Sequence, residues 1–170
     1  MRVIYLISCI TFLMKRKLVY IFSFFVLFFL FSVANVHSQD DWWVDKNYKY
    51  EKTRIKYHLC KNAFKDIAFG FSNQNINYIN LYFGTQVYLN IIGDEKGYYS
   101  ANQAELILVD FMEYFGVFSV KYLRSHHKNS YAFAIGKCYY NRGSGKRELS
   151  ISVALKYRYK KWIIDQINIY

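Results

Sequence analysis

Apolar residues recur at helical spacing between residues 100 and 115. Ser100 is a favoured N-cap residue, and Gln103 three positions later completes a capping box. The apolar positions that follow are three or four residues apart, and they are Ala104, Ile107, Leu108, Phe111 and Phe115. Glu105 and Glu113 fall outside this stripe. We therefore predict a central helix that begins after Ser100 and covers a sheet with its apolar stripe.

The segment before this helix carries two helical patterns and one extended pattern. Its first apolar stripe starts after residue 57 and contains Cys60, Ala63, Phe64, Ile67 and Phe71, with Gly70 near the predicted end. Residues 76–83 carry a shorter helical pattern that Gly84 closes. Strict alternation over residues 87–91 predicts a strand, and residues 93–97 are rich in turn formers.

Four strand patterns follow Gly116 at short spacing. They span residues 117–125, 131–140, 147–157 and 162–169. Connections as short as those between them join antiparallel hairpins, so we predict a four-stranded meander. The whole pattern predicts an α+β protein in which two to three N-terminal helices pack on an antiparallel sheet.

The first 38 residues have the pattern of a secretory leader. Lys15, Arg16 and Lys17 precede an apolar run over residues 18–34, and small or neutral residues then lead to Ser38. We predict a signal peptide over residues 1–38 with Met14 as the true start, cleaved after Ser38, or after Ala34 as the second choice. The predicted location is periplasmic or secreted. The alternative is an uncleaved anchor, for which the apolar run is short.

The rest of the chain divides into an arm and one domain. Residues 39–56 alternate between polar and aromatic residues, and we expect a flexible arm whose Trp42-Trp43 pair docks on the domain. Residues 57–170 have a length that suits one α+β domain. The net charge of +11 would suit nucleic acid, but export and the missing RNA-binding signature exclude that role. The expected partners are a small ligand or an envelope protein, with membrane contact only through an uncleaved leader.

The candidate metal and redox residues predict no cofactor. Cys60 and Cys138 fall on apolar faces, where two buried thiols are expected, although one bridge between them stays open. The Cys and His spacings are not those of a zinc site. His126 and His127 are adjacent on a strand end, so they point to opposite faces and we expect a solvated turn.

Several short motifs in the chain resemble one family. They are Tyr99-Ser100, Gln103-Ala104-Glu105, Ile107-Leu108, Asp110-Phe111, Ala134-Ile135-Gly136, Leu155-Lys156 and residues 164–169. Over residues 61–170 the chain resembles a small exported bacterial family, a domain of unknown function with the nuclear-transport-factor-two-like fold. The resemblance implies a cone, in which a curved sheet wraps over helices around a pocket, and it implies no reaction. The Trp/Tyr-rich arm and the charge at Asp165 depart from the family pattern.

Two classes of function follow from this fold. The first is an exported, non-catalytic module that binds a small ligand or a protein, and we expect no catalytic residue. The alternative is an isomerase- or dehydratase-type enzyme that uses a carboxylate in the cone pocket. Asp165 is the pocket candidate because it interrupts the apolar row Ile163, Ile167 and Ile169. The competing interpretation of Asp165 is an edge carboxylate that pairs with a neighbouring Lys or reaches solvent.

The sequence also predicts two surfaces, a basic rim and a buried outer sheet face. Alternate turns of a meander lie at the same end of the sheet, which would gather a basic rim of Lys128, Lys156, Arg158, Lys160 and Lys161. Such a rim could contact anionic envelope polymers or lipid head groups, although most charged rims only solubilise. The strands at residues 131–140 and 162–169 carry apolar residues on both faces. We therefore expect the outer sheet face to be buried in a two-fold homodimer, or else under the Trp42-Trp43 arm.

Overall fold

The computed structural model describes residues 42–44, 46, 48–92, 95–142 and 145–170. The predicted leader, its cleavage sites and Met14 lie outside these residues. In the part of the chain that is described, no helix has both the length and the apolar character needed to cross a membrane.

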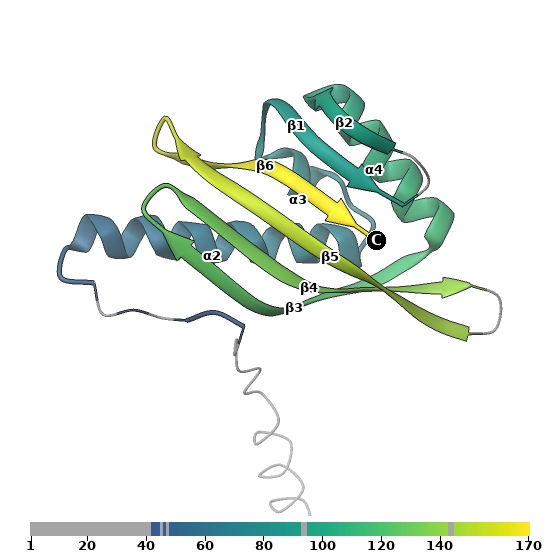
Figure 1. Ribbon diagram of the computed structural model, residues 1–170, viewed down its shortest axis with the longest axis horizontal. Helices are drawn as coiled ribbons and strands as arrows, with labels where there is room; N and C mark the ends of the chain where they lie inside the picture. The colour runs from purple at the N-terminus through teal and green to yellow at the C-terminus, as the bar shows by residue number, and fades with distance from the viewer. Residues whose placement is uncertain (1–41, 45, 47, 93–94, 143–144) are drawn as a thin grey trace, which may run out of the picture. The chain divides into compact units, whose positions relative to one another are not determined.

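Three helices and six strands make up the described chain (Figure 1). The helices are α2 (Glu51–Ser72), α3 (Asn77–Asn80) and α4 (Ala101–Phe115). The strands are β1 (Phe83–Ile91), β2 (Glu95–Ser100), β3 (Val117–Lys128), β4 (Tyr131–Arg142), β5 (Gly145–Arg158) and β6 (Lys161–Ile169). They form one sheet in the order β2-β1-β6-β5-β4-β3.

The sheet is mixed, which corrects the prediction of an antiparallel sheet. Strands β3 to β6 form the predicted meander, and β1 also pairs antiparallel with β2. However, β1 runs parallel to β6, with Leu89 opposite Ile167 and Ile91 opposite Ile169. Alternation of apolar residues determines which face of a strand is buried, but it does not encode the direction of a distant neighbour.

Several elements differ from the predicted boundaries. The short second helix predicted over residues 76–83 is α3, which ends at Asn80, and Gly84 lies inside β1, which begins at Phe83 instead of residue 87. Helix α2 begins at Glu51, six residues before the start expected at residue 57, so its first turns include residues assigned to the arm. Strand β2 occupies residues predicted as a turn and the approach to the central helix. This strand has one mainly exposed face and a Gly in its centre, so its sequence lacks the alternation of a half-buried strand.

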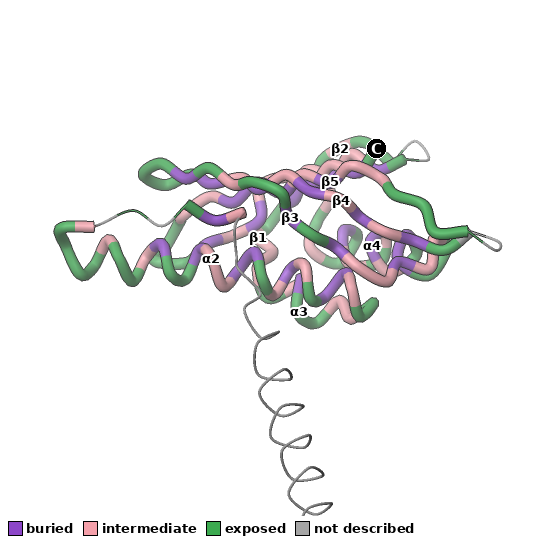
Figure 2. Tube along the Cα trace, turned by 90° about the horizontal axis from the view of Figure 1, so that it is seen from below, coloured by how far each residue is buried: buried purple, intermediate pink, exposed green. Residues whose placement is uncertain are grey.

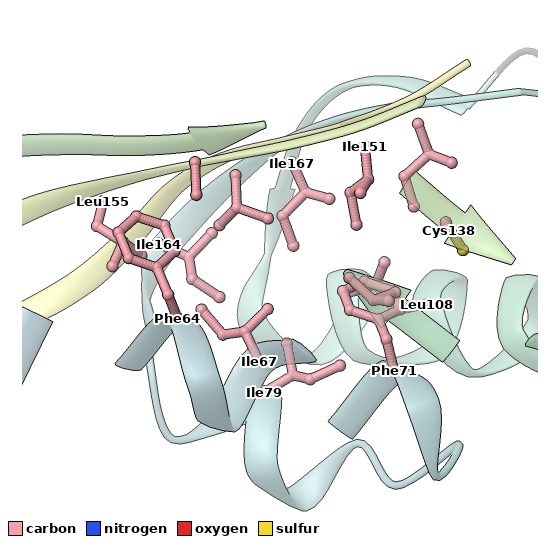
Figure 3. Packing of buried hydrophobic residues seen from close by; sticks show 14 of the residues in the cluster. Phe64, Ile67, Phe71, Ile79, Leu108, Cys138, Ile151, Leu155, Ile164 and Ile167 are labelled. Carbon is pink, nitrogen blue, oxygen red and sulfur yellow. The ribbon is translucent and has the colours of Figure 1, made fainter. Parts of the chain in front are cut away.

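Helices cover one face of the sheet. Figure 2 shows α2, α3 and α4 on the same side, with buried positions where helices and sheet meet. Phe64, Ile67 and Phe71 of α2 fill the space beneath the strands together with Leu108 of α4 (Figure 3). Ile151 of β5 and residues of β6 close this core from the sheet side (Figure 3). The interior under the centre of the sheet is therefore filled by side chains.

Helix α4 has the predicted capping box. The Ser100 hydroxyl accepts a hydrogen bond from the backbone N–H of Gln103, and the Gln103 side chain accepts one from the backbone N–H of Ser100 at 3.0 Å. The helix ends at Gly116, whose φ of 60° is the left-handed conformation that glycine adopts readily.

The apolar stripe of α4 is only partly buried in the core. Leu108, Phe111 and Met112 are buried against the core. Ile107 and Phe115, which the spacing also assigned to the core, are only half-buried. They lie along the edge of the stripe that borders a pocket.

Candidate ligand-binding site

An open pocket lies beside the C-terminal half of α4. It has a volume of about 560 Å³ and is lined by residues of α4, the end of β1, the start of β2 and β4: Ile91, Ile92, Glu95, Ile107, Asp110, Phe111, Tyr114, Phe115 and Tyr140. This volume lies within the range of small-molecule sites. We call it the α4 pocket.

Aromatic rings in mutual contact form one wall of the α4 pocket. The ring of Phe115 lies 4.9 Å from that of Phe111 and meets the rings of Tyr114 and Tyr140 edge to face at 5.1 and 5.2 Å between centroids. Edge-to-face contacts of this kind favour a fixed arrangement of the rings. A further hollow of about 240 Å³ adjoins Tyr114, Phe115 and Tyr140 and reaches Asn141.

Two carboxylates stand at the margin of this wall. Glu95 and Asp110 are exposed, and they are the charged residues among the described lining of the α4 pocket. Glu95 accepts a hydrogen bond of 2.8 Å from the Tyr99 hydroxyl, and this bond raises the pKa of Tyr99. The last turn of α4 contains no basic residue. The chemistry of the pocket is therefore apolar and aromatic with negative charge at its rim.

The sequence pattern did not mark these lining residues as a site. Phe115 looked like the end of a core stripe, and Tyr140 looked like the end of a strand. One signal was present, because Tyr114 is an aromatic residue of α4 outside the predicted stripe. The sequence contained no signal that would bring Glu95 beside α4, because β2 was not recognised.

Asp165 lies away from the α4 pocket. Its carboxylate pairs with the ammonium of Lys156 at 2.7 Å, both side chains being partly exposed. The pairing of β5 with β6 shifts here, since Ala154 faces Gln166 while Leu155 faces Ile164. The extra residue is a β-bulge, which moves Ile167 and Ile169 to the buried face. The predicted row that joined Asp165 to those two residues is therefore wrong. The expected pairing with a neighbouring Lys is seen, although β6 is an internal strand and not an edge of the sheet.

The turns of the predicted basic rim do lie at one end of the sheet. Tyr131 is opposite Lys156, and the Tyr157 N–H donates a 2.7 Å hydrogen bond to the Ser130 carbonyl beside the first turn. Lys128, Arg158, Lys160 and Lys161 are exposed there. Lys156 is the exception, because its ammonium pairs with Asp165.

His127 is buried, which corrects the prediction of a solvated turn. Only 2% of its surface is exposed. Its ring stacks on Trp43 at 4.7 Å, lies 4.5 Å from the Tyr57 ring and hydrogen-bonds the Tyr48 hydroxyl. Strand β3 continues to Lys128, and a shift in its pairing near Leu123 turns His127 inward. His126 is exposed, as expected for adjacent strand residues.

The Trp pair of the arm docks as predicted, but on the helix side of the sheet. Trp43 is buried, and Trp42 contacts the rings of Phe64 and Tyr122. The Ser125 hydroxyl donates a 2.8 Å hydrogen bond to the Trp42 carbonyl. Because Tyr122 and Phe64 belong to the core, the described residues of the arm do not cover the outer sheet face. The alternative that placed it there is wrong.

A second cavity lies beneath the arm. Its volume is about 310 Å³, and its lining combines the rings of Trp43, Tyr48 and Tyr57 with basic side chains of Lys46, Arg54, Lys61 and Lys65. Lys61 and Lys65 already have interaction partners.

Both described cysteines are buried free thiols. Burial raises the pKa of Cys60, and it raises that of Cys138 to about 12. Thiols with a raised pKa are poor nucleophiles at neutral pH. Across the described ranges, no group of three or more His, Cys, Asp or Glu residues is placed to hold a metal ion.

Comparisons with known proteins place the chain in a family. Residues 64–170 match the family described as "Domain of unknown function (DUF4783)". A DUF4783 protein of Bacteroides uniformis is 21% identical, with 62% of this chain and 93% of that chain covered and a TM-score of 0.56. One from Bacteroides fragilis is 22% identical, with 61% and 93% covered and a TM-score of 0.54. No curated protein matches the chain.

The name of a third similar solved structure includes that of the fold. A variant of the protein Rd1NTF2_05 is 11% identical, with 68% of this chain and 99% of that chain covered and a TM-score of 0.56. At such identities the likeness of the structures shows the fold alone. Since the family match spans more than half of its length, the chain belongs to the DUF4783 family and has a nuclear-transport-factor-two-like fold.

Proposed function

We propose that the protein is an exported, non-catalytic module that binds a small apolar ligand in the α4 pocket. The observation that carries the proposal is the pocket itself, which combines a volume of about 560 Å³ with a wall of contacting aromatic rings. Apolar concave sites with few polar groups are the usual small-molecule sites of proteins. Side chains fill the core beneath the sheet, so we place the ligand in this peripheral pocket and not at the centre of the cone.

The arrangement of carboxylates supports binding rather than catalysis. An isomerase-type base needs a carboxylate in an apolar, water-poor wall, where burial tunes its pKa. Glu95 and Asp110 are both exposed, and Asp165 pairs with Lys156 on another surface. None of these three carboxylates therefore meets the requirement of the enzyme alternative.

Export rests on the leader pattern of residues 15–38. A processed protein would begin near Gln39, and intact-mass measurement of protein recovered from a bacterial envelope would detect this. A mass that retains the apolar run over residues 18–34 would instead support the anchored form.

A neutral fluorescent probe tests ligand binding. N-phenylnaphthylamine is apolar and uncharged, so its fluorescence enhancement should report entry into an apolar pocket. Ile107→Trp places a larger side chain on the lining, and we expect the probe affinity to fall about tenfold or more. Leu106→Trp is the matched control, because Leu106 is the preceding residue of the same helix, is 66% exposed and lies outside the lining.

The proposal fails if the unaltered protein does not enhance the fluorescence of the probe. It also fails if Ile107→Trp and Leu106→Trp bind the probe with the same affinity while both remain folded by circular dichroism.

A further inference from the structure

The geometry points to a ligand that carries a cationic ammonium group on its apolar body, held in the α4 pocket. This inference rests on the proposed function and adds the chemical class of the ligand. Three features of the pocket favour positive charge.

The first feature is the aromatic wall. Tyr and Phe rings attract a cation over their faces, because the faces carry the negative part of the ring quadrupole. Phe115 stands between the rings of Phe111, Tyr114 and Tyr140, all within 5.2 Å between centroids. An edge-to-face arrangement leaves ring faces directed along different axes, so several faces can border one site.

The second feature is the pair of carboxylates. Asp110 of α4 and Glu95 of β2 lie on two elements that border the same pocket. No Lys or Arg occurs among the described residues of the lining. This local negative charge contrasts with the chain as a whole, whose net charge is +11. General attraction of anions to a basic protein therefore does not describe this pocket.

The third feature is the end of α4. The pocket borders the last two turns of the helix through Asp110, Tyr114 and Phe115. The C-terminus of a helix carries partial negative charge that cations offset. In α4 the last turn has no basic side chain to do so, and the cap is the glycine Gly116. A bound ammonium group would supply the missing positive charge.

Three ten-carbon amphiphiles test whether the charge of the head group contributes to binding beyond the apolar chain. Decyltrimethylammonium, decanol and decanoate share the same chain length and differ in the charge of the head group. Each is titrated below its micelle concentration against N-phenylnaphthylamine bound to the full protein, at low ionic strength. We expect decyltrimethylammonium to displace the probe about tenfold more effectively than decanoate, with decanol between them.

Substitutions of the two carboxylates test whether they cause the preference for the cationic head group. The double substitution Glu95→Gln and Asp110→Asn should reduce the advantage of decyltrimethylammonium over decanol to less than about twofold. Glu113→Gln is the control, since Glu113 is an exposed carboxylate in the last turn of the same helix and lies outside the lining. This control should retain the preference for the cation.

Each result has a distinct meaning. Equal displacement by decyltrimethylammonium and decanol, or stronger displacement by decanoate, would overturn the cationic ligand and leave the apolar pocket standing. An equal loss of preference in Glu113→Gln and in the double variant would assign the effect to general surface charge and would also overturn the inference. Failure of the probe and of all three amphiphiles to bind would overturn the proposed function itself.

Discussion

Gly136 allows β4 to approach β3 closely because glycine has no side chain. A Cβ atom at this position would lie 2.2 Å from the Lys121 carbonyl oxygen and 2.7 Å from the Tyr122 Cα. Both obstacles are backbone atoms of β3, so a rotamer change cannot relieve the clash. We predict that Gly136→Ala lowers the free energy of unfolding by about 2–3 kcal/mol, measured by urea denaturation.

Gly145→Ala is the control for that substitution, because a Cβ there meets nothing within 4 Å. It should change the free energy of unfolding by less than about 1 kcal/mol. Equal denaturation midpoints for the two variants would contradict the close approach of β3 and β4.

Single inserted residues shift the strand pairing at two places, and beyond them the sequence pattern no longer predicts which face of the strand is buried. A strand face can be predicted from alternation only while the pairing register is constant. The shift near Leu123 turns His127 inward, and the bulge at Asp165 moves Ile167 and Ile169 to the core. Neither inserted residue is a glycine, although Gly136 of β4 lies opposite Tyr122 beside the first shift. The face of each residue beyond these points therefore could not be predicted from the strand pattern alone.

Helix α4 allows the two sides of one element to be compared. Phe111 is buried against the core, whereas Glu113 is exposed two residues later. Truncation of a buried Phe to Ala typically costs about 3–5 kcal/mol, so Phe111→Ala should lower the denaturation midpoint strongly. Glu113→Ala should leave it nearly unchanged. Similar midpoints in urea for the two variants would show that the assignment of the buried face is wrong.

At the scale of elements, the sequence predicted those whose cause is local. The capping box at Ser100, the stripe of α4 and the hairpins from β3 to β6 all depend on neighbours within a few residues or on short turns. Strand β2 forms a short hairpin with β1 but was missed because its sequence lacks the alternation of a half-buried strand. The parallel contact of β1 with β6 depends on residues far apart in the chain. The α4 pocket was missed for the same reason, because it forms where β1, β2, α4 and β4 converge.

For the described chain as a whole, the sheet has two unlike faces. The side chains of β4 alternate as predicted, with Ala132, Ala134 and Gly136 toward the helices. On the other face Tyr131, Phe133 and Ile135 are exposed or half-buried. Polar groups occupy the same face at β5 and β6, where Asn168 accepts a hydrogen bond from Gln166 and donates one to Ser152. This face combines an apolar row with hydrogen-bonding groups, a composition that interfaces between proteins share.

The homodimer remains our prediction for this face, because the described part of the arm packs on the helix side and does not cover it. A two-fold axis would place the apolar row of β4 against its own copy. We expect the protein to sediment as a dimer at tens of micromolar. Ile135→Lys should shift it to a monomer, since a charge would then be buried opposite itself. Leu106→Lys, an exposed site on α4, should remain dimeric. A monomer at that concentration without any substitution would show that the dimer is wrong.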